Sequence, residues 1–330
     1  MRSRVPLVLF AFLLALAGLT ACGTTEPAAA PPGAAPTGAA AAGGPITLTD
    51  SRGKQITLPK PATRVVGLEW NVIEHAISLG VMPVGAADIK GYTAWVQAEP
   101  LDPSVKDVGV RGEPSIDSIA ALRPDLILAT DSLPDAAVTQ MEQFAPVVFV
   151  PGGDAKDPVG QMRKNLALVA KALGKDAEAN TLLAAFEAKV ADGKAKLAAR
   201  AGQKFVFADG YAEGGQVSIR PFTTGSLVSG VTQQLGLTNA WPDAGDPAYG
   251  LAQTDVEGLT KAGDVQFLYI VNDGDGGDVF GNQLATNAVW KSLPFVKAGN
   301  VHRIPDGMWM FGGPTSMERY VDAVVAALGS

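Results

Sequence analysis

Short apolar runs alternate with amphipathic segments over most of the chain. Val65–Leu68 has the pattern of a short buried strand, and the helical pattern that follows, over about Val72–Leu79, ends at Gly80. Another apolar run, Val81–Gly85, begins a second strand. Strands that alternate with helices in this way predict a mainly parallel α/β sheet.

The next stretch of sequence repeats the alternation more clearly. A helix is predicted at Ile116–Leu122, and after Pro124 breaks the helical pattern a strand is predicted at Asp125–Leu128. Pro134–Phe144 again has a helical pattern, and Val147–Val150 is apolar throughout, as expected of a strand with both faces covered. These elements together predict an N-terminal α/β lobe.

A longer amphipathic pattern follows this lobe. Asp157 suits the N-cap of a helix, and Pro158 suits the first helical position. Apolar residues then recur at three- and four-residue steps as far as Leu173, and Gly174 ends the pattern. A helix of this length spans about 25 Å, enough to cross between two lobes. We therefore predict that residues 157–174 form the interlobe helix, and a single crossing of this kind predicts a stiff joint with little closure.

A second α/β series follows a further helix at about Ala177–Arg200 and opens with the strand pattern Phe205–Ala208. Thr254–Leu268 resembles Pro114–Leu128 in the first half, because each has a capped short helix that opens with an acidic residue, then an aspartate, then an apolar strand. We therefore predict two similar lobes. They are expected at residues 45–156 and 175–330, with a last helix at about Thr315–Leu328.

The N-terminal region has a different pattern. Two arginines precede the apolar run Val5–Leu19, which at about 15 residues is shorter than the ~20 that a spanning helix needs. Leu19–Cys22 resembles the lipobox of bacterial lipoproteins. That resemblance implies a signal peptide at residues 1–21 and a mature protein lipid-anchored at Cys22 on the extracytoplasmic face of the cell membrane. An ordinary secretory signal or an uncleaved anchor are the alternatives.

The residues after the lipobox are mostly Ala, Gly, Pro and Thr. Such a composition has too little apolar surface to fold, so residues 22–44, the lipidated cysteine included, are predicted to form a disordered tether. Cys22 is the only cysteine of the chain, which excludes an intramolecular disulfide and a multi-thiolate metal site. The simplest use of its thiol is lipidation.

The charge of the chain limits its partners. Without the two arginines of the signal, 24 basic and 33 acidic side chains remain, a net charge of −9, and the basic residues form no cluster. A nucleic-acid or anionic-lipid partner normally requires a basic stripe, so neither is predicted. Asp273–Asp278 superficially resembles a calcium loop but lacks the downstream glutamate, and it is interpreted as a solvated turn.

Five motifs follow one another along the chain, at Arg64–Val66, Leu79–Gly85, Pro114–Ile119, Leu122–Ile127 and Leu293–Val301. In this order they resemble those of substrate-binding proteins of iron-siderophore and cobalamin ABC importers. The resemblance covers roughly Ile46–Leu328 and implies an α/β fold of two Rossmann-like lobes with mainly parallel sheets, joined by one long interlobe helix. This is the helical-backbone periplasmic binding protein fold. It also implies a monomeric receptor without catalytic residues, cofactor or enzymatic activity.

Further segments narrow the resemblance, namely Leu68–Trp70, Trp95 with Arg111 sixteen residues later, Val108–Pro114, Leu237–Trp241 and Met308–Gly312. They make the sequence most similar, within that family, to ferric hydroxamate-binding proteins. The similarity implies that an iron(III)-siderophore complex binds in a cleft between the lobes, where an arginine meets ligand oxygens and aromatic side chains line the pocket. The residues that match these positions are Arg111, Trp95, Trp241, Trp309, Phe311 and Trp70.

The chemistry of such a ligand agrees with these residue types. The iron of a ferric hydroxamate is saturated by the oxygens of its chelator, so the protein supplies no direct metal ligand. An arginine offers a charged planar set of donors, and tryptophan offers a large rigid face. A zinc or manganese receptor would need clustered His and carboxylate ligands, whereas the chain has only His75 and His302.

Two departures from the hydroxamate-receptor pattern concern phenolic groups. Asp131–Leu133 stands where those receptors place a tyrosine, and Phe311 stands where a hydroxylated ring is usual. Tyr92, Tyr211 or Tyr249 could replace the missing hydroxyl groups. Each cleft residue also has an ordinary interpretation, because buried tryptophans often only pack and an arginine often only pairs with an acid.

Asp117 and Glu257 have two interpretations. Both lie in the first turn of a predicted helix, with Ser115 and Thr254 as N-caps, so they can be explained by capping alone. The family resemblance instead implies that one acid on each lobe meets arginines of the membrane permease dimer of the importer. We favour docking, because two similar lobes that face a two-fold partner need a matched pair.

Other ligand classes and one other protein class remain as alternatives. A receptor for cobalamin, haem or a catecholate siderophore is the nearest alternative, although a catecholate would favour several cleft arginines and only Arg111, Arg220 and Arg303 are available. An extracellular hydrolase is the alternative from another class. It is disfavoured because the sequence has no Gly-x-Ser-x-Gly motif and neither histidine lies in a recognisable motif.

Overall fold

The structure is a computed structural model that describes residues 44–131 and 133–329. The predicted signal peptide, the lipidated Cys22 and the tether up to residue 43 lie outside the described residues. In the described ranges, no helix combines the length and apolar character that a membrane crossing requires. Nor do those residues bring three His, Cys, Asp or Glu side chains together as a possible metal site.

The N-terminal lobe is built on a five-stranded parallel sheet in the order β5-β4-β3-β6-β7. Its strands are β3 (Val65–Gly67), β4 (Gly85–Ala86), β5 (Lys106–Asp107), β6 (Leu126–Thr130) and β7 (Val147–Val150). Its helices are α1 (Trp70–Ser78), α2 (Ile89–Trp95), α3 (Ile116–Ala121) and α4 (Asp135–Met141). Every residue of β6 and β7 is buried, in keeping with their apolar sequences, in which Thr130 is the one polar residue.

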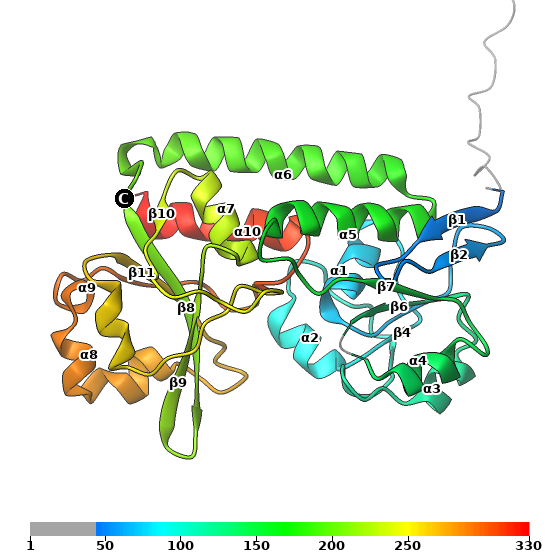
Figure 1. Ribbon diagram of the computed structural model, residues 1–330, viewed down its shortest axis with the longest axis horizontal. Helices are drawn as coiled ribbons and strands as arrows, with labels where there is room; N and C mark the ends of the chain where they lie inside the picture. Colours follow the sequence, from blue (N-terminus) through cyan, green and yellow to red (C-terminus); the bar gives the residue numbers. More distant parts are fainter. Residues whose placement is uncertain (1–43, 132, 330) are drawn as a thin grey trace, which may run out of the picture. The chain divides into compact units, whose positions relative to one another are not determined.

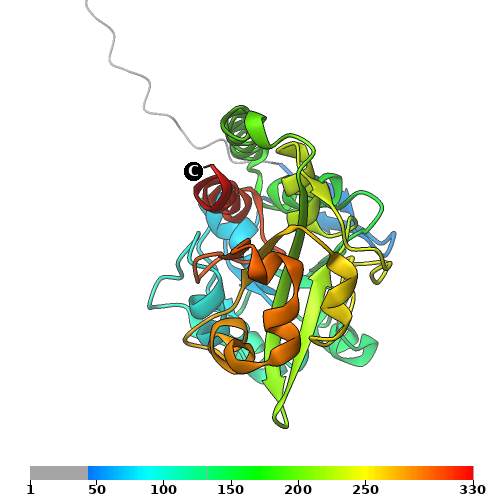
Figure 2. The same cartoon turned by 90° about the vertical axis from the view of Figure 1, so that its left-hand side faces the viewer.

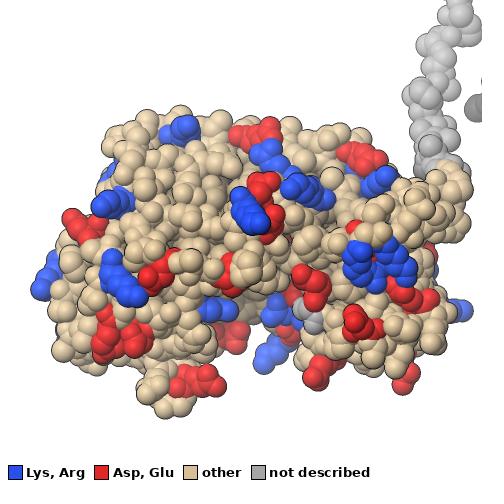
Figure 3. Space-filling model, in the orientation of Figure 1, with Lys and Arg blue, Asp and Glu red and all other residues tan. Residues whose placement is uncertain are grey.

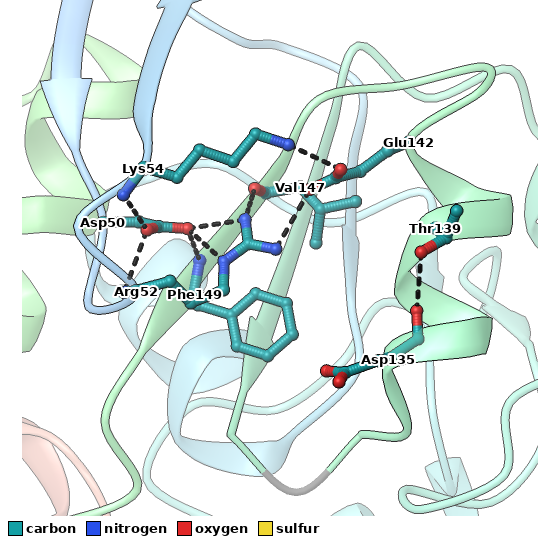
Figure 4. Close-up of polar contacts among 8 residues, drawn as sticks. All are labelled: Asp50, Arg52, Lys54, Asp135, Thr139, Glu142, Val147 and Phe149. Carbon is teal, nitrogen blue, oxygen red and sulfur yellow. Dashed lines mark hydrogen bonds and ion pairs between the residues drawn. The ribbon is translucent and has the colours of Figure 1, made fainter.

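A hairpin of β1 (Ile46–Thr49) and β2 (Gln55–Leu58) precedes this sheet. Arg52, in the turn of this hairpin, contacts the lobe in two ways (Figure 4). Its guanidinium carbon lies 4.3 Å from the Phe149 ring centroid, and its Nη2 donates a hydrogen bond to the Val147 carbonyl at 2.9 Å. Buried Asp50 accepts hydrogen bonds from Arg52 and from the backbone of Lys54, as the same figure shows. The described chain therefore starts from an anchored hairpin.

Two long helices connect the lobes, α5 (Pro158–Leu173) and α6 (Asp176–Lys196). Both predicted caps of α5 are confirmed, because the Asp157 side chain accepts from the Gly160 N–H and Gly174 adopts a left-handed conformation with φ 66°. α5 begins against the C-terminal lobe and ends beside β1 and β2, so it contacts both lobes. α6 then runs back and extends over both lobes in Figure 1, a second bridge that the sequence pattern does not predict.

The C-terminal lobe has a second five-stranded sheet, in which β10-β8-β11-β12 are parallel and β9 pairs with β8 as an antiparallel hairpin. The strands are β8 (Lys204–Glu213), β9 (Gln216–Phe222), β10 (Thr238–Asn239), β11 (Gln266–Ile270) and β12 (Val301–Arg303). The α-helices are α7 (Leu227–Gln234), α8 (Ala288–Ser292), α9 (Pro294–Lys297) and α10 (Pro314–Leu328). The short helical turns are η1 (Ala198–Arg200), η2 (Gly258–Ala262), η3 (Val279–Gln283) and η4 (Leu284–Thr286). Figure 2 shows α6 and α10 almost end-on, on the side opposite the tip of the β8–β9 hairpin.

The two lobes share one hydrophobic cluster. Trp70, Ile73 and Tyr92 of the N-terminal lobe belong to the same buried cluster as residues of β8, β9 and α10, and residues of α5 and α6 contribute to it. A shared core resists relative movement of the two sheets, because interiors are densely packed and small shifts lose many contacts. The stiff joint with little closure stays a prediction, which the shared cluster and the bridging of the lobes by more than one helix support.

Candidate functional site

A cleft of about 500 Å³ lies between the lobes and is lined from both of them. Figure 3 shows the surface hollowed between the lobes, with both acidic and basic side chains around the hollow. Five of the six residues predicted to bind ligand line this cleft. They are Arg111, Trp95, Trp309, Phe311 and Trp70.

Aromatic rings form one wall of the cleft. Trp309 lies at its centre, with its ring centroid 4.6 Å from that of Trp70, 5.0 Å from Phe311 and 6.5 Å from Trp95, all in edge-to-face geometry. Tyr249 extends the wall, because its ring meets Phe311 edge-to-face at 5.3 Å. Edge-to-face contacts restrict the rings, so the wall offers a rigid apolar surface to a ligand.

Arg111 lies on this wall. Its guanidinium carbon is 3.8 Å from the Trp70 ring centroid, and its Nη1 donates to Glu69 Oε1 at 2.9 Å. Asp88 Oδ2 is 3.8 Å from Nε, at the edge of ion-pair distance. The stacked and paired guanidinium keeps further N–H groups for a ligand, and its side chain remains 34% exposed.

A second arginine enters the cleft from the C-terminal lobe. Arg220 on β9 lies opposite Asp209 on β8, to which its Nε donates at 2.9 Å and its Nη2 donates a second, shorter hydrogen bond. Burial raises the pKa of Asp209, and the hydrogen bonds from Arg220 oppose that rise. From the sequence, Arg220 is predicted only as one of the arginines available to the cleft. The signal that was missed is the position of Asp209 directly after a predicted strand, where ligand sites of α/β sheets are common.

Trp241 is the predicted binding residue that the structure places elsewhere. Its side chain is buried in the hydrophobic cluster beneath β8 and β11, and it does not line the cleft. The backbone N–H of Trp241 donates to Asn239 Oδ1 at 2.9 Å, which fixes the chain just after β10. Because its ring faces the core, we leave Trp241 out of the proposed binding residues.

Of the three tyrosines considered as replacements, two line the cleft. Tyr211, on the β8–β9 hairpin, is exposed, and Tyr249 lies beside Phe311. Burial raises the pKa of Tyr249 to about 12, so its phenol stays protonated and able to donate at neutral pH. Tyr92 is fully buried and donates to the Glu99 carbonyl at 2.7 Å, outside the cleft.

The segment Asp273–Asp278 is more than a solvated turn. Asp275 Oδ2 accepts a hydrogen bond from Trp95 Nε1 at 2.8 Å, so this segment of the C-terminal lobe touches α2 of the N-terminal lobe. The preceding Asn272 donates from Nδ2 to the Ala94 carbonyl, also at 2.8 Å. Residues 273–276 form an exposed turn, in agreement with the interpretation as a solvated turn, and the segment also contacts the other lobe beside the cleft.

Asp117 and Glu257 are both exposed, and neither side chain has a hydrogen bond or ion pair within the described ranges. Ser115 caps α3 as predicted, because its Oγ accepts from the Ser118 N–H at 3.3 Å. The predicted N-cap at Thr254 is wrong. Asp255 Oδ1 instead accepts from the Gly258 N–H at 2.8 Å, and the turn is a short 3₁₀ helix.

Two α/β lobes, bridging helices and a cleft between the sheets define a binding protein of the two-lobed receptor class. The chain belongs to the Periplasmic binding protein family, whose sequence pattern matches residues 65–307. This match covers both sheets and the helices that bridge them.

Particular relatives are similar over most of the chain. The iron(3+)-hydroxamate-binding protein FhuD of Escherichia coli (strain K12) is 27% identical over 271 residues, which cover 81% of this chain and 87% of that protein. The probable siderophore-binding lipoprotein YfiY of Bacillus subtilis (strain 168) is 26% identical over 328 residues, which cover 95% of this chain and 94% of that protein. Among solved structures, Fe3+-Desferal-bound siderophore binding protein FhuD from Vibrio cholerae has a TM-score of 0.71 and 28% identity, covering 81% of this chain and 98% of that one.

Proposed function

We propose that this protein is an extracytoplasmic solute-binding lipoprotein that captures a ferric siderophore of the hydroxamate type in its interlobe cleft and delivers it to an ABC permease. The observation that carries the proposal is the placement of Arg111, stacked on Trp70 beside an aromatic wall in a cleft of about 500 Å³. The names of the Escherichia coli and Vibrio cholerae relatives support the same ligand class.

The chemistry of a ferric trihydroxamate matches this arrangement. Its six donor oxygens saturate the iron, so a receptor must offer hydrogen-bond donors to the oxygens and apolar faces to the linkers. Arg111 supplies a charged donor, and the phenols of Tyr211 and Tyr249 supply neutral ones in place of the tyrosine absent at Asp131–Leu133. The tryptophan and phenylalanine rings supply the apolar faces.

The remaining parts of the proposal concern delivery. Cys22 would carry the lipid anchor, and Asp117 and Glu257 would meet the permease dimer, one acid from each lobe. Both acids are exposed and unpaired in the described chain, which leaves them available for cationic partners. The receptor would act as a monomer, with no cofactor and no catalytic step.

Replacement of Arg111 by alanine tests the binding proposal. We expect Arg111→Ala to weaken binding of a ferric trihydroxamate by at least about tenfold, equivalent to about 1.4 kcal/mol, in a titration of intrinsic tryptophan fluorescence. Arg163→Ala is the matched control, because Arg163 pairs with Glu187 on the surface of α5 and α6, outside the cleft lining. Equal affinity of the Arg111→Ala variant and the unmodified protein would overturn the role of Arg111.

The ligand class is tested with a panel of chelates on the unmodified protein. Ferric trihydroxamates should quench tryptophan fluorescence at lower concentration than ferric catecholates, ferric citrate, haem or cobalamin. If one of the other compounds bound more tightly, the proposed ligand class would be wrong and that compound would indicate the correct one. No response to any of them would overturn siderophore capture itself.

A further inference from the structure

The charged side chains that line the cleft are unequal in number. The lining contains three carboxylates, from Glu69, Asp209 and Asp275, and two guanidinium groups, from Arg111 and Arg220. An anionic ligand would normally be met by an excess of positive charge. This cleft has the opposite excess.

Each arginine of the cleft is already paired within its own lobe. Arg111 is bonded to Glu69, with Asp88 close by, and Arg220 makes two hydrogen bonds to Asp209. A carboxylate this close offsets most of the field of its arginine, although the remaining N–H groups still donate hydrogen bonds. The two arginines therefore act toward a ligand more as hydrogen-bond donors than as free positive charges.

Asp275 is the carboxylate that has no cationic partner. The neighbouring Asp273 and Asp278 both pair with Arg303, whereas Asp275 makes no ion pair in the part of the chain that the structure describes. Its Oδ2 accepts from Trp95 Nε1 at 2.8 Å, and this bond holds the carboxylate at the edge of the aromatic wall. The side chain is exposed, so Oδ1 is accessible to a group on the ligand.

We propose that the cleft selects ferric chelates of neutral or positive net charge, and that Asp275 receives a pendant ammonium group of the ligand. The inference rests on the proposed function and narrows its ligand class. Three hydroxamates carry three negative charges and give a neutral complex with iron(III), whereas three catecholates carry six and leave a charge of −3. A trihydroxamate with a terminal primary amine carries +1 at neutral pH, which complements Asp275.

A matched pair of ligands tests the contribution of the ammonium charge alone. The first is a linear ferric trihydroxamate with a free terminal amine, and the second is the same chelate after N-acetylation of that amine. We expect the unmodified protein to bind the amine form roughly two- to fivefold more tightly, the range of an ion pair still accessible to water. The preference should shrink as the salt concentration rises.

The variant Asp275→Asn removes the charge and keeps an oxygen that can accept from Trp95. We expect it to bind the two chelates equally, while Asp135→Asn, the same change of net charge on α4 outside the cleft lining, should keep the preference. Equal affinities in the unmodified protein, or a preference that survives in Asp275→Asn, would overturn the inference. If neither chelate binds to the unmodified protein, the proposed function fails instead, so the two failures can be told apart.

Discussion

The Ser316 hydroxyl on α10 donates a hydrogen bond to Oε2 of Glu74 on α1 at 2.9 Å, and the Ser316 backbone N–H donates to Oε1 of the same carboxylate at 3.1 Å. The Gly313 N–H and the Thr315 hydroxyl also donate to Oε1. A fully buried carboxylate of the N-terminal lobe thus holds the first turn of the last helix. That turn begins just after the cleft residues Trp309 and Phe311.

Loss of this carboxylate should destabilise the whole fold. Glu74→Ala leaves buried donors at the start of α10 without an acceptor, and we expect the free energy of unfolding to fall by on the order of 3 kcal/mol. Urea denaturation followed by circular dichroism measures the change. Glu318→Ala, on the outer part of α10, should change the free energy by less than about 1 kcal/mol and serves as the control. Equal effects of the two variants would contradict the role of Glu74.

The neighbour of Glu74 gives a test by pH. Burial raises the pKa of Glu74 to about 7 and lowers the pKa of His75 to about 4. A raised carboxyl pKa stabilises the fold at low pH, and that contribution is lost as pH rises from about 4.5 to 7. A lowered histidine pKa acts in the opposite direction, since its contribution is lost as pH falls from 6.5 toward 4. The two residues therefore change the free energy of unfolding with pH in opposite directions.

The variant His75→Leu should reveal the pH dependence of stability that Glu74 causes, because the opposing contribution of His75 is removed. In this variant we expect the free energy of unfolding to decrease between about pH 4.5 and pH 7, whereas the unmodified protein should change little over that window. At full effect a pKa change of this size corresponds to roughly 3 kcal/mol. Chemical denaturation at intervals of half a pH unit gives the profile. A variant whose stability rises with pH across this window would show that Glu74 does not titrate as described.

The pair of Arg220 and Asp209 lies in the cleft, and two variants can separate its effect on stability from its proposed effect on ligand binding. Arg220→Leu leaves a buried carboxylate unpaired and should cost roughly 3 kcal/mol of stability. Arg220→Leu combined with Asp209→Leu should recover most of that stability but still bind a ferric trihydroxamate more weakly, because the donors of Arg220 are gone. Thermal unfolding and fluorescence titration of both variants provide the two readouts. Full affinity in the double variant would exclude Arg220 from ligand contact.

The docking proposal is tested by reversing charge on both lobes. Asp117→Arg together with Glu257→Arg should abolish siderophore uptake by cells and leave binding by the purified protein unchanged, because neither side chain lines the cleft. Glu187→Arg together with Asp192→Arg makes the same change of net charge on α6, which lies opposite α3 in Figure 1, and should transport normally. Normal uptake by the first pair would rule out docking through these acids.

Elements with strong local signals were predicted well. Asp157, Pro158 and Gly174 act through hydrogen bonds and dihedral angles within one turn of α5, so the sequence is enough to locate the ends of that helix. The direction in which α5 runs depends instead on which faces of both lobes it covers. An amphipathic pattern shows that one face of a helix is buried but not what covers it, so the sequence predicted one bridging helix where α5 and α6 both contact the two lobes.

The cleft was predicted only in part, for a related reason. Trp241 and Trp309 both lie in loop-like sequence, and only the packing of the folded chain places Trp309 in the cleft and Trp241 in the core. The pairing of Asp209 with Arg220 depends on the register of β8 against β9, which is set across the hairpin. At η2 the sequence pattern predicts Thr254 as the cap, whereas the hydrogen bond from the Gly258 N–H goes to Asp255 Oδ1.

The hydrophobic cluster shared by the two lobes has a consequence for recognition of a loaded receptor. Since one packed interior runs through both lobes, the spacing between their outer surfaces should be nearly the same in empty and occupied molecules. A permease that contacts both surfaces would then find almost the same distance between them in the empty and in the loaded receptor. The presence of cargo would have to be read at the mouth of the cleft, from the chelate itself and from the side chains that touch it.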